Sequence, residues 1–508
     1  MTLGAICLRS GVFRTLPWGG LVSKSLAAGG FTRLPIVVAV ASAALVLGGT
    51  TATANVALTQ VSSDPFTNST SQHRTQVEPD TFAFGNTIVS AFQTGRFFDG
   101  GASDIGFATS TNGGTTWTTG MLPGITKFQG GGRFDRVSDP AVAFDSRHNV
   151  WMISSLALTD TSGVVGAAVV TSRSTDGGLT WGNPVTTATA GGNLDKNWIV
   201  CDNTSTSPFW GNCYTEFDNN AAGNAIRMSR STNGGLNWST PVGNSSGSTG
   251  LGGQPVVRPN GTVLMPYLSN NNQIRSFRSV DGGVSWRASV LVSSISAHTV
   301  AGGLRTSPLP SAEVDSAGTA YVVWQDCRFR SGCPSNDIVM SKSTNETTWG
   351  AVTRITTDAG DHFIPGIGVD RTTSGASARI GLTYYRYPTA SCSASTCQLT
   401  VGYVSSTNGG ASWSTATQLA GPMTLSWIAN TSQGRMVGDY ISTSVLPGGR
   451  AWPVIAVASA PSGGTFNEAM FVPTGGLTIA GGALASVKNP VYVHTPNGGR
   501  PEVPGTRR

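Results

Sequence analysis

Charged residues are scarce in this chain. Only 11% of its 508 residues are Asp, Glu, Lys or Arg, and the formal net charge is +6. The basic residues do not gather into a run interleaved with aromatic side chains, which is the composition of a nucleic-acid-binding surface. We therefore expect no nucleic-acid partner. The 66 glycines combined with so few charges are typical of exported, turn-rich β proteins rather than helical cytoplasmic enzymes.

A long hydrophobic run is also missing. The apolar stretch at 34–47 has about 14 residues, whereas a dependable membrane span needs about 20. Basic residues precede this stretch and Ala52-Thr53-Ala54 follows it, which is the pattern of an export signal. We predict a signal segment at 1–54 and a secreted or cell-surface chain that begins near Asn55, is a monomer and has no stable membrane span. An uncleaved anchor is the alternative.

Cysteines and metal-binding motifs are few. Of the seven cysteines, Cys7 falls in the predicted signal segment, and the other six form three short-range couples: Cys201 with Cys213, Cys327 with Cys333, and Cys392 with Cys397. Such couples suggest disulfides formed in an oxidising compartment. The CxxC spacing of zinc sites and the DxDxDG spacing of a dedicated calcium loop are absent. We predict no metal site and no cofactor, although a calcium ion held by scattered oxygens stays open.

The chain instead contains six copies of one short sequence motif. The copies are Ser110–Trp117, Ser174–Trp181, Ser231–Trp238, Ser279–Trp286, the shorter Ser343–Trp349, and Ser406–Trp413. Their tryptophans lie 64, 57, 48, 63 and 64 residues apart, which suits four-stranded propeller blades with loop insertions. Within each copy, Asp or Asn bonds the turn backbone, and glycines take the positive φ angles that a Cβ disfavours.

Strand patterns around these copies define the expected fold. Upstream of each copy, a strand that opens in Pro or Asp leads through an apolar alternation and a turn to a second strand. We predict an all-β β-propeller of four-stranded blades over residues 55–475, with seven blades favoured over six. The seventh unit lacks the repeat and starts near Val437, and residues 56–61 are a candidate closing strand. Residues 476–508 are predicted to form a final strand or loop and a disordered tail.

Ionisable residues concentrate at the predicted strand openings. The first strands of the units open with Glu78, Asp80, Asp139, Asp195, Lys196, Glu313, His362 and Asp439, and second strands end in Arg96, Arg328 and Arg386. In a propeller these positions converge on the mouth of the central channel. Converging ionisable groups suit acid–base chemistry and the binding of an anionic sugar. The structural alternative is that the acids cap turns and the arginines brace neighbouring blades.

The repeat, S-x-[DN]-x-G-x-x-W, resembles the Asp-box of the sialidase superfamily, which is also called the bacterial neuraminidase repeat. This resemblance implies a propeller whose boxes face away from the active site. Sialidases carry an Arg-Ile-Pro opening in the first blade, and its arginine begins a triad that grips the substrate carboxylate. Here the corresponding stretch is Val77-Glu78-Pro79, so the arginine is absent and the opening carries an acid instead.

The resemblance also suggests catalytic residues. In the family, a Gly-Arg or Asp-Arg pair precedes the aspartate acid; here Gly95-Arg96 precedes Asp99 and Asp104, of which Asp99 is favoured. The family nucleophile is a tyrosine polarised by a glutamate. Glu313 is the candidate glutamate, and Tyr384, Tyr385 or their rival Tyr440 is the candidate nucleophile. The substrate-binding candidates are Arg96, Arg328, Arg386, Glu78, Asp139, Asp439 and His362.

Three functions remain open at this point. The favoured one is an exported sialidase-like glycoside hydrolase acting on an acidic or polar glycan, with an exo-α-sialidase as one form of it. The absent arginine favours the alternative, a non-catalytic propeller that binds glycan or protein. In the third, a polysaccharide lyase, His362 and a tyrosine of the stretch TYYRY would abstract a proton beside a uronate carboxylate.

Overall fold

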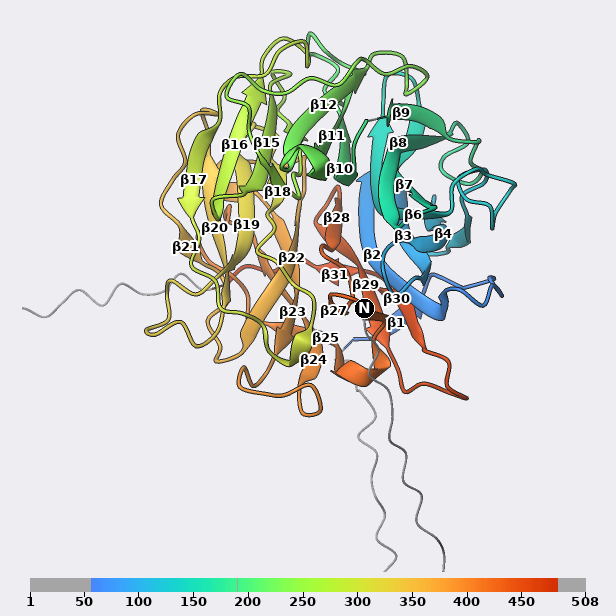
Figure 1. Ribbon diagram of the computed structural model, residues 1–508. Coiled ribbons are helices and arrows are strands. Elements are labelled where there is room, and N and C mark those ends of the chain that lie inside the picture. The colour runs from blue at the N-terminus through green and yellow to red at the C-terminus, as the bar shows by residue number, and fades with distance from the viewer. Residues whose placement is uncertain (1–55, 190, 483–508) are drawn as a thin grey trace, which may run out of the picture. The chain divides into compact units, whose positions relative to one another are not determined.

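The computed structural model describes residues 56–189 and 191–482 (Figure 1). Their regular structure consists of β-strands and four 3₁₀ turns: η1 (Asn220–Ala222), η2 (Ala301–Gly303), η3 (Gly375–Ser377) and η4 (Leu425–Trp427). No helix in these ranges is long and apolar enough to cross a membrane. The predicted all-β fold is therefore confirmed, while the predicted signal segment and residues 483–508 of the predicted tail lie outside the described residues.

The strands form antiparallel groups of consecutive hairpins, as the repeat spacing predicts. The first two groups are β2 (Gln72–Phe84), β3 (Thr87–Arg96), β4 (Ala102–Ser110) and β5 (Thr118–Met121), then β6 (Arg136–Asp145), β7 (Val150–Asp160), β8 (Val164–Ser174) and β9 (Val185–Thr189). The next two are β10 (Leu194–Cys201), β11 (Cys213–Asn219) and β12 (Ala225–Ser231), then β13 (Gly250–Leu251), β14 (Val256–Val257), β15 (Val263–Ser269), β16 (Gln273–Ser279) and β17 (Val290–Ser294).

Two further groups repeat the same plan. They are β18 (Ser311–Val314), β19 (Ala320–Asp326), β20 (Asp337–Ser343) and β21 (Thr353–Arg354), then β22 (Asp361–Val369), β23 (Ile380–Tyr387), β24 (Gln398–Ser406) and β25 (Thr417–Thr424). A short hairpin of β26 (Asn430–Thr431) and β27 (Gly434–Arg435) follows them. Each box begins at the last residue of β4, β8, β12, β16, β20 or β24. In all of these groups except β10–β12, one more strand follows the box and forms the outer edge of the group.

The last group joins the two ends of the described chain. It contains β28 (Ser442–Leu446), β29 (Arg450–Ala458) and β30 (Glu468–Pro473), and β31 (Leu477–Thr478) pairs with β29. The candidate strand at 56–61 is present as β1 (Leu58–Gln60), which pairs antiparallel with β30. An outer strand from the beginning of the chain therefore completes the sheet formed by its end, which leaves β30 without an open edge.

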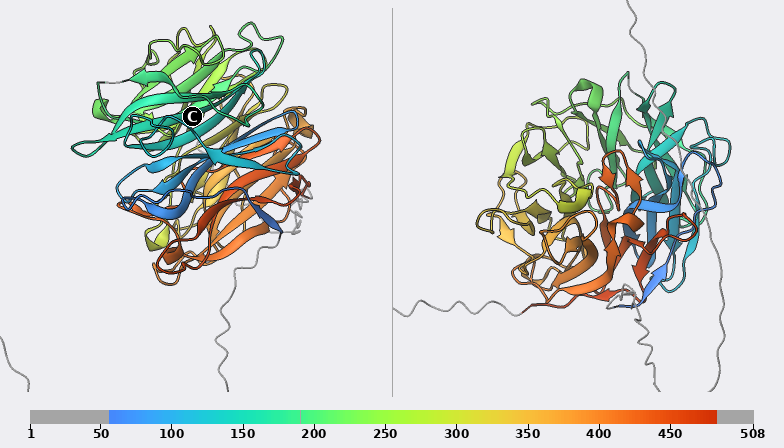
Figure 2. Two further views of the ribbon diagram at one scale, coloured as in Figure 1. Left: turned by 90° about the vertical axis from the view of Figure 1, so that its right-hand side faces the viewer. Right: turned by 60° about the horizontal axis from the view of Figure 1, so that its bottom comes forward.

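The first strands of neighbouring groups contact one another in chain order. β2 contacts β6, β6 contacts β10, and the contacts continue through β14, β18, β22 and β28 back to β2. The two views of Figure 2 show the groups side by side, and Figure 1 shows β2, β10, β18, β22 and β28 towards the middle. Residues that sit at equivalent places in the first strands are therefore brought towards each other, although they are far apart in the sequence.

Each box is a hydrogen-bonded turn. In the second copy, Ser174 Oγ accepts the Gly178 amide at 2.9 Å, and Asp176 Oδ1 accepts the Thr180 amide at 3.0 Å. Gly177 and Gly178 have φ of 84° and 82°, where a Cβ is disfavoured. The serine, the acid or amide, and the glycines of the repeat are thus explained by the turn alone.

The box tryptophan packs not only on its own group of strands but also on the preceding group. Trp181 meets Phe107 of β4 with ring centroids 5.8 Å apart, and Trp286 meets Tyr214 of β11 at 6.4 Å. Trp117, in the first box, packs at 6.1 Å on Trp452 of β29 in the last group. The repeat therefore stabilises the junctions between sheets.

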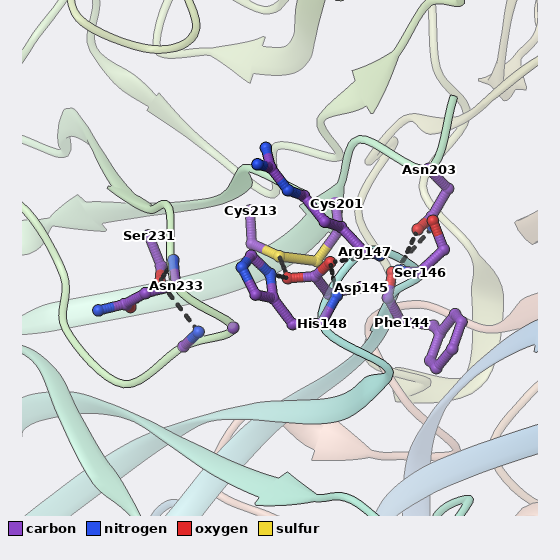
Figure 3. The surroundings of a disulfide bond; sticks show 12 residues. Phe144, Asp145, Ser146, Arg147, His148, Cys201, Asn203, Cys213, Ser231 and Asn233 are labelled. Atoms are coloured by element: carbon purple, nitrogen blue, oxygen red, sulfur yellow. Dashed lines mark hydrogen bonds and ion pairs between the residues drawn. A yellow bond between two sulfur atoms is a disulfide. The ribbon is translucent and has the colours of Figure 1, made fainter. Parts of the chain in front are cut away.

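The three predicted cysteine couples are disulfides. Figure 3 shows the bond between Cys201 at the end of β10 and Cys213 at the start of β11. Beside it, the buried Asp145 carboxylate lies 2.6 Å from His148 Nδ1 and accepts the amides of Arg147 and His148 at 3.0 and 3.1 Å. The disulfide closes the loop between β10 and β11 and holds it beside this turn.

Replacing a box tryptophan should weaken a junction between two sheets. Trp181→Ala leaves a cavity against Phe107, so we expect the free energy of unfolding to fall by about 3–5 kcal/mol. Denaturant unfolding followed by circular dichroism measures this. The matched control is Leu179→Ala in the same box, where the side chain is 37% exposed and the change should stay within about 0.5 kcal/mol. Equal effects of the two substitutions would contradict the junction role.

Candidate functional site

A left-handed kink interrupts the first strand of several sheets. Glu78 in β2, Asp139 in β6, Lys196 in β10 and Ile364 in β22 have φ between 46° and 58°, and the strand pairing shifts register at each of them. All but Lys196 precede a proline, which cannot donate to the strand ladder. A bulge of this kind redirects the side chain that it carries. Three of these four side chains are charged.

The three charged kink residues meet two side chains from other segments. Lys196 Nζ lies 3.6 Å from Glu78 Oε1 and 3.3 Å from Asp139 Oδ1, and it also donates to Asp439. Arg305, in the segment before β18, donates from Nε to Asp439 Oδ1 at 2.7 Å. We call Glu78, Asp139, Lys196, Arg305 and Asp439 the charge cluster. Its members come from five separate segments of the chain.

Burial and pairing decide the protonation of the charge cluster. Arg305 is the most exposed member, with 19% of its side chain accessible, while the other four are at 8% or less. Burial disfavours a charge on Asp439, but Lys196 and Arg305 outweigh it and hold the pKa of that carboxyl well below its usual range. Burial raises the pKa of Glu78 to about 7, against the opposing effect of Lys196. The cluster therefore combines a permanently ionised acid with one that titrates near neutrality.

Aromatic and cationic side chains adjoin the cluster. The Tyr440 hydroxyl donates to the Pro140 carbonyl at 3.0 Å, and its ring packs edge-on against Trp198 at 4.9 Å. Burial, together with Glu78 and Asp139, raises the pKa of Tyr440 well above its ordinary value. Arg96 is also buried, which lowers its pKa to about 10. Of the predicted residues, Glu78, Asp139, Lys196 and Asp439 are thus brought together, with Tyr440 beside them.

Asp99 lies in a neighbouring cavity of about 460 Å³. Arg136, which lies three residues before Asp139 in the chain, donates to both Asp99 and Asp160. This hydrogen bond from Arg136 holds the pKa of Asp99 below its ordinary value. Phe97 and Phe98 also line the cavity, and Phe98 is 52% exposed. The predicted acid therefore has an aromatic surface nearby but is held in its ionised form.

The other predicted residues have local partners. Glu313 pairs with Arg371 at 2.9 Å, Arg328 with Asp326 at 2.7 Å, and Arg386 with Asp358 at 3.6 Å. His362 lies 3.2 Å from Asp358 and packs against the Tyr384 ring. His362 and Tyr384 are both fully buried. The buried Tyr385 donates to the Ala456 carbonyl at 2.8 Å. Within the described residues, no hydrogen bond or ion pair joins any of these side chains to Asp99 or to the charge cluster.

Sequence analysis missed two residues at the cluster. Arg305 lies seven residues before the strand opening expected at Ala312, although the nearby prolines at 308 and 310 repeat the signal of the other openings. Gln93 in β3 donates to Glu78 and, at 3.1 Å, to Ser138 Oγ. A neutral side chain in an apolar strand does not by itself indicate a functional residue. Both residues are found only through the contacts of the first strands.

No family model and no curated protein sequence matches the chain. Among solved structures, a Dyadobacter fermentans protein of unknown function is 16% identical with a TM-score of 0.45, over 69% of this chain and 98% of its own. A Hadza microbial sialidase is 16% identical with a TM-score of 0.42, over 62% and 64%. A leech intramolecular trans-sialidase, in complex with 2,7-anhydro-Neu5Ac, is 14% identical with a TM-score of 0.38, over 82% and 70%. Similarity at this level assigns no activity to the chain.

Residues 56–189 and 191–482 contain no group of three or more His, Cys, Asp or Glu side chains placed to hold a metal ion. The acids of the charge cluster are instead neutralised by Lys196 and Arg305. Acids and cations arranged in this way can transfer protons and pair with charged groups of a ligand.

Buried acids beside the cluster should make stability depend on pH. Asp80 in β2 accepts the Val142 amide at 2.6 Å, and burial raises its pKa from 3.8 to about 7. The folded state then binds a proton that the unfolded state has lost, so this contribution is present below pH 3.8 and is lost as pH rises through 7. Asp80→Asn should remove roughly 2 kcal/mol of the difference in unfolding free energy between pH 5 and pH 8.5.

Urea unfolding at the two pH values measures this difference. The matched control is Asp176→Asn in the second box, because the pKa of Asp176 is lowered to about 2 and its carboxylate stays ionised at both pH values. Asp176→Asn should lower the unfolding free energy by the same amount at pH 5 and at pH 8.5. An unchanged pH dependence in Asp80→Asn would show that Asp80 ionises normally.

Proposed function

We propose that this protein is an exported glycoside hydrolase of sialidase-like architecture that acts on an acidic or polar glycan at the charge cluster. In this proposal the sheets close into a seven-bladed propeller. The cyclic contacts of the first strands, the pairing of β1 with β30, and the packing of Trp117 on Trp452 support the closure. The three disulfides support export, because such bonds persist in oxidising compartments.

The observation that carries the proposal is the convergence of five charged side chains on the kinks of the first strands. Non-glycine residues with φ near 50° are unfavourable and are concentrated at functional sites. Here three of them carry charge, and Lys196 lies within ion-pairing distance of the other two, Glu78 and Asp139. Acids with differently shifted pKa values at one place are a common basis of acid–base catalysis.

Four of the five members have a role in this proposal. Glu78, with its pKa near 7, exchanges a proton at neutral pH. Tyr440 is the phenol beside it: its hydroxyl would leave the Pro140 carbonyl, and Glu78 would accept the phenolic proton as the tyrosine oxygen attacks the anomeric carbon. The glycosidic bond would break in this step and the leaving oxygen would take a proton from the acid. Water would then hydrolyse the bond between tyrosine and sugar, with its proton returning to the acid and that of Glu78 to the tyrosine oxygen. Arg305, the most exposed member, would meet the acidic group of the glycan, and Lys196 keeps Asp439 ionised. The role of Asp99 as the acid remains a prediction, since the pair with Arg136 has to open before Asp99 can hold a proton.

A non-catalytic, glycan-binding protein is the second candidate. One observation favours it, because the acids and bases of the charge cluster are paired with one another rather than left free. Buried charges that are fully paired are also found where they only fix a structure. The two candidates differ in whether a glycosidic bond is broken.

Fluorogenic glycosides of N-acetylneuraminic acid and of uronic acids test the hydrolase directly. We expect the purified protein to release the fluorophore from at least one of them. Glu78→Gln should lower kcat/KM by about 100-fold or more, the usual effect of losing a general acid–base group.

The matched variant is Glu313→Gln, which changes the glutamate predicted from the family resemblance and paired with Arg371. It should retain activity within about twofold, since Glu313 does not touch the cluster. A large loss in Glu313→Gln with none in Glu78→Gln would move the site to Glu313. The absence of release from every glycoside would favour the binding protein.

A further inference from the structure

A second cavity, of about 510 Å³, lies where the first strands end. Phe82 and Phe84 at the end of β2, Glu313 in β18, Arg371 directly after β22, and Val445 in β28 line its walls. No member of the charge cluster lines it. Its volume falls within the roughly 300–1,000 Å³ of small-molecule sites. The same first strands thus carry a cluster of charges at their kinks and an open cavity at their ends.

One ion pair supplies the charged groups that reach this cavity. Arg371 Nη2 donates to Glu313 Oε2 at 2.9 Å, and the two side chains are 35% and 19% exposed. Among the residues that the structure describes, Glu313 is the one acceptor of Arg371, so most of the five guanidinium N–H donors are free for a ligand. Glu313 Oε1 likewise has no donor within the described residues.

Apolar and aromatic surface forms much of the remaining wall. The Phe84 ring is 42% exposed and packs on Phe144 with centroids 4.6 Å apart. The Arg371 guanidinium stacks 4.9 Å from the centre of the Phe82 ring, which holds the guanidinium plane in place. Val257, Pro259 and Val445 complete this surface. The Arg371 donor and the Glu313 acceptor, already held in position, therefore lie on the same cavity wall as the exposed Phe84 ring.

The charges restrict what can bind. An anionic ligand would be attracted by Arg371 but repelled by Glu313 and by the buried Asp315, which also lines the cavity. A cationic ligand would be attracted by the two acids, but it would be repelled by Arg371 and would compete with Arg371 for Glu313. A neutral ligand with neighbouring hydroxyl groups avoids both penalties, because it donates to the glutamate and accepts from the arginine. The C–H face of a sugar ring would pack on the exposed phenylalanine.

We propose that this cavity binds a neutral sugar, as a monosaccharide or as the end of a longer glycan. The site is separate from the charge cluster and does not depend on the proposed hydrolase activity. It places a recognition site for a neutral part of a glycan on the same protein as the acid–base cluster.

Ligand-observed NMR titrations with the purified full chain test the proposal. The probes are methyl glycosides of glucose, galactose, mannose and N-acetylglucosamine, together with lactose and maltose. We expect at least one of them to saturate with a Kd in the millimolar range. Arg371→Ala should raise that Kd by about tenfold or more, which corresponds to ~1.4 kcal/mol.

A second variant separates binding from any effect on folding. Thr204→Trp changes a partly exposed residue at the cavity wall, and its indole would fill the space without removing a core contact. It should abolish binding. The matched control is Arg379→Ala, which removes an exposed arginine that does not line the cavity and should leave the Kd unchanged.

Three results would overturn the proposal. The first is that no neutral sugar binds the unmodified protein, and the second is that carboxylated sugars bind the cavity more tightly than neutral ones. The third is that binding survives both Arg371→Ala and Thr204→Trp, which would place the sugar elsewhere. Binding that is lost in these variants but retained in Glu78→Gln would separate this site from the charge cluster.

Discussion

The ion pairs of Lys196 depend on the left-handed kinks of the first strands. A non-glycine residue in the left-handed region costs roughly 1–2 kcal/mol, and Glu78, Asp139 and Lys196 all adopt it. A buried charge without a partner costs several kcal/mol more. The kinks bring the three charges within 4 Å of a partner, and the partners make their burial tolerable. Without the kinks, these three buried charges would lack the partners that compensate their burial.

The kink at Ile364 shows that this backbone shape belongs to the repeat itself. Ile364 has the same φ and the same register shift as the charged kinks, but its apolar side chain packs in the core. The fold therefore supplies equivalent positions in the first strands, and the side chain at each one decides what the position does. Glu78, Asp139 and Lys196 turn three of these positions into an ionic centre.

The first strands separate two kinds of chemistry along their length. At the kinks, the charged side chains are mostly buried and paired with one another, which suits proton transfer. At the strand ends, the pair of Glu313 and Arg371 remains open to solvent beside apolar surface, which suits the recognition of a neutral ligand. Glu313 is the residue for which the role expected from the sequence and the contacts in the structure differ most. The family resemblance suggests a role beside a catalytic tyrosine, but in the structure its carboxylate faces Arg371 in the second cavity.

The repeat by itself determined the all-β fold, the hairpin order and the turns of the boxes, because the hydrogen bonds that form the turn of a box join residues no more than four apart. The cysteine couples were predictable for the same reason, since each closes a short loop. Only the tertiary structure decided which ionisable residues meet. Arg305 and Asp439 are 134 residues apart in sequence, and their contact depends on how the first strands sit around one another. Spacing cannot supply that information, because a shift of one residue at a kink turns a side chain from its neighbours to the core.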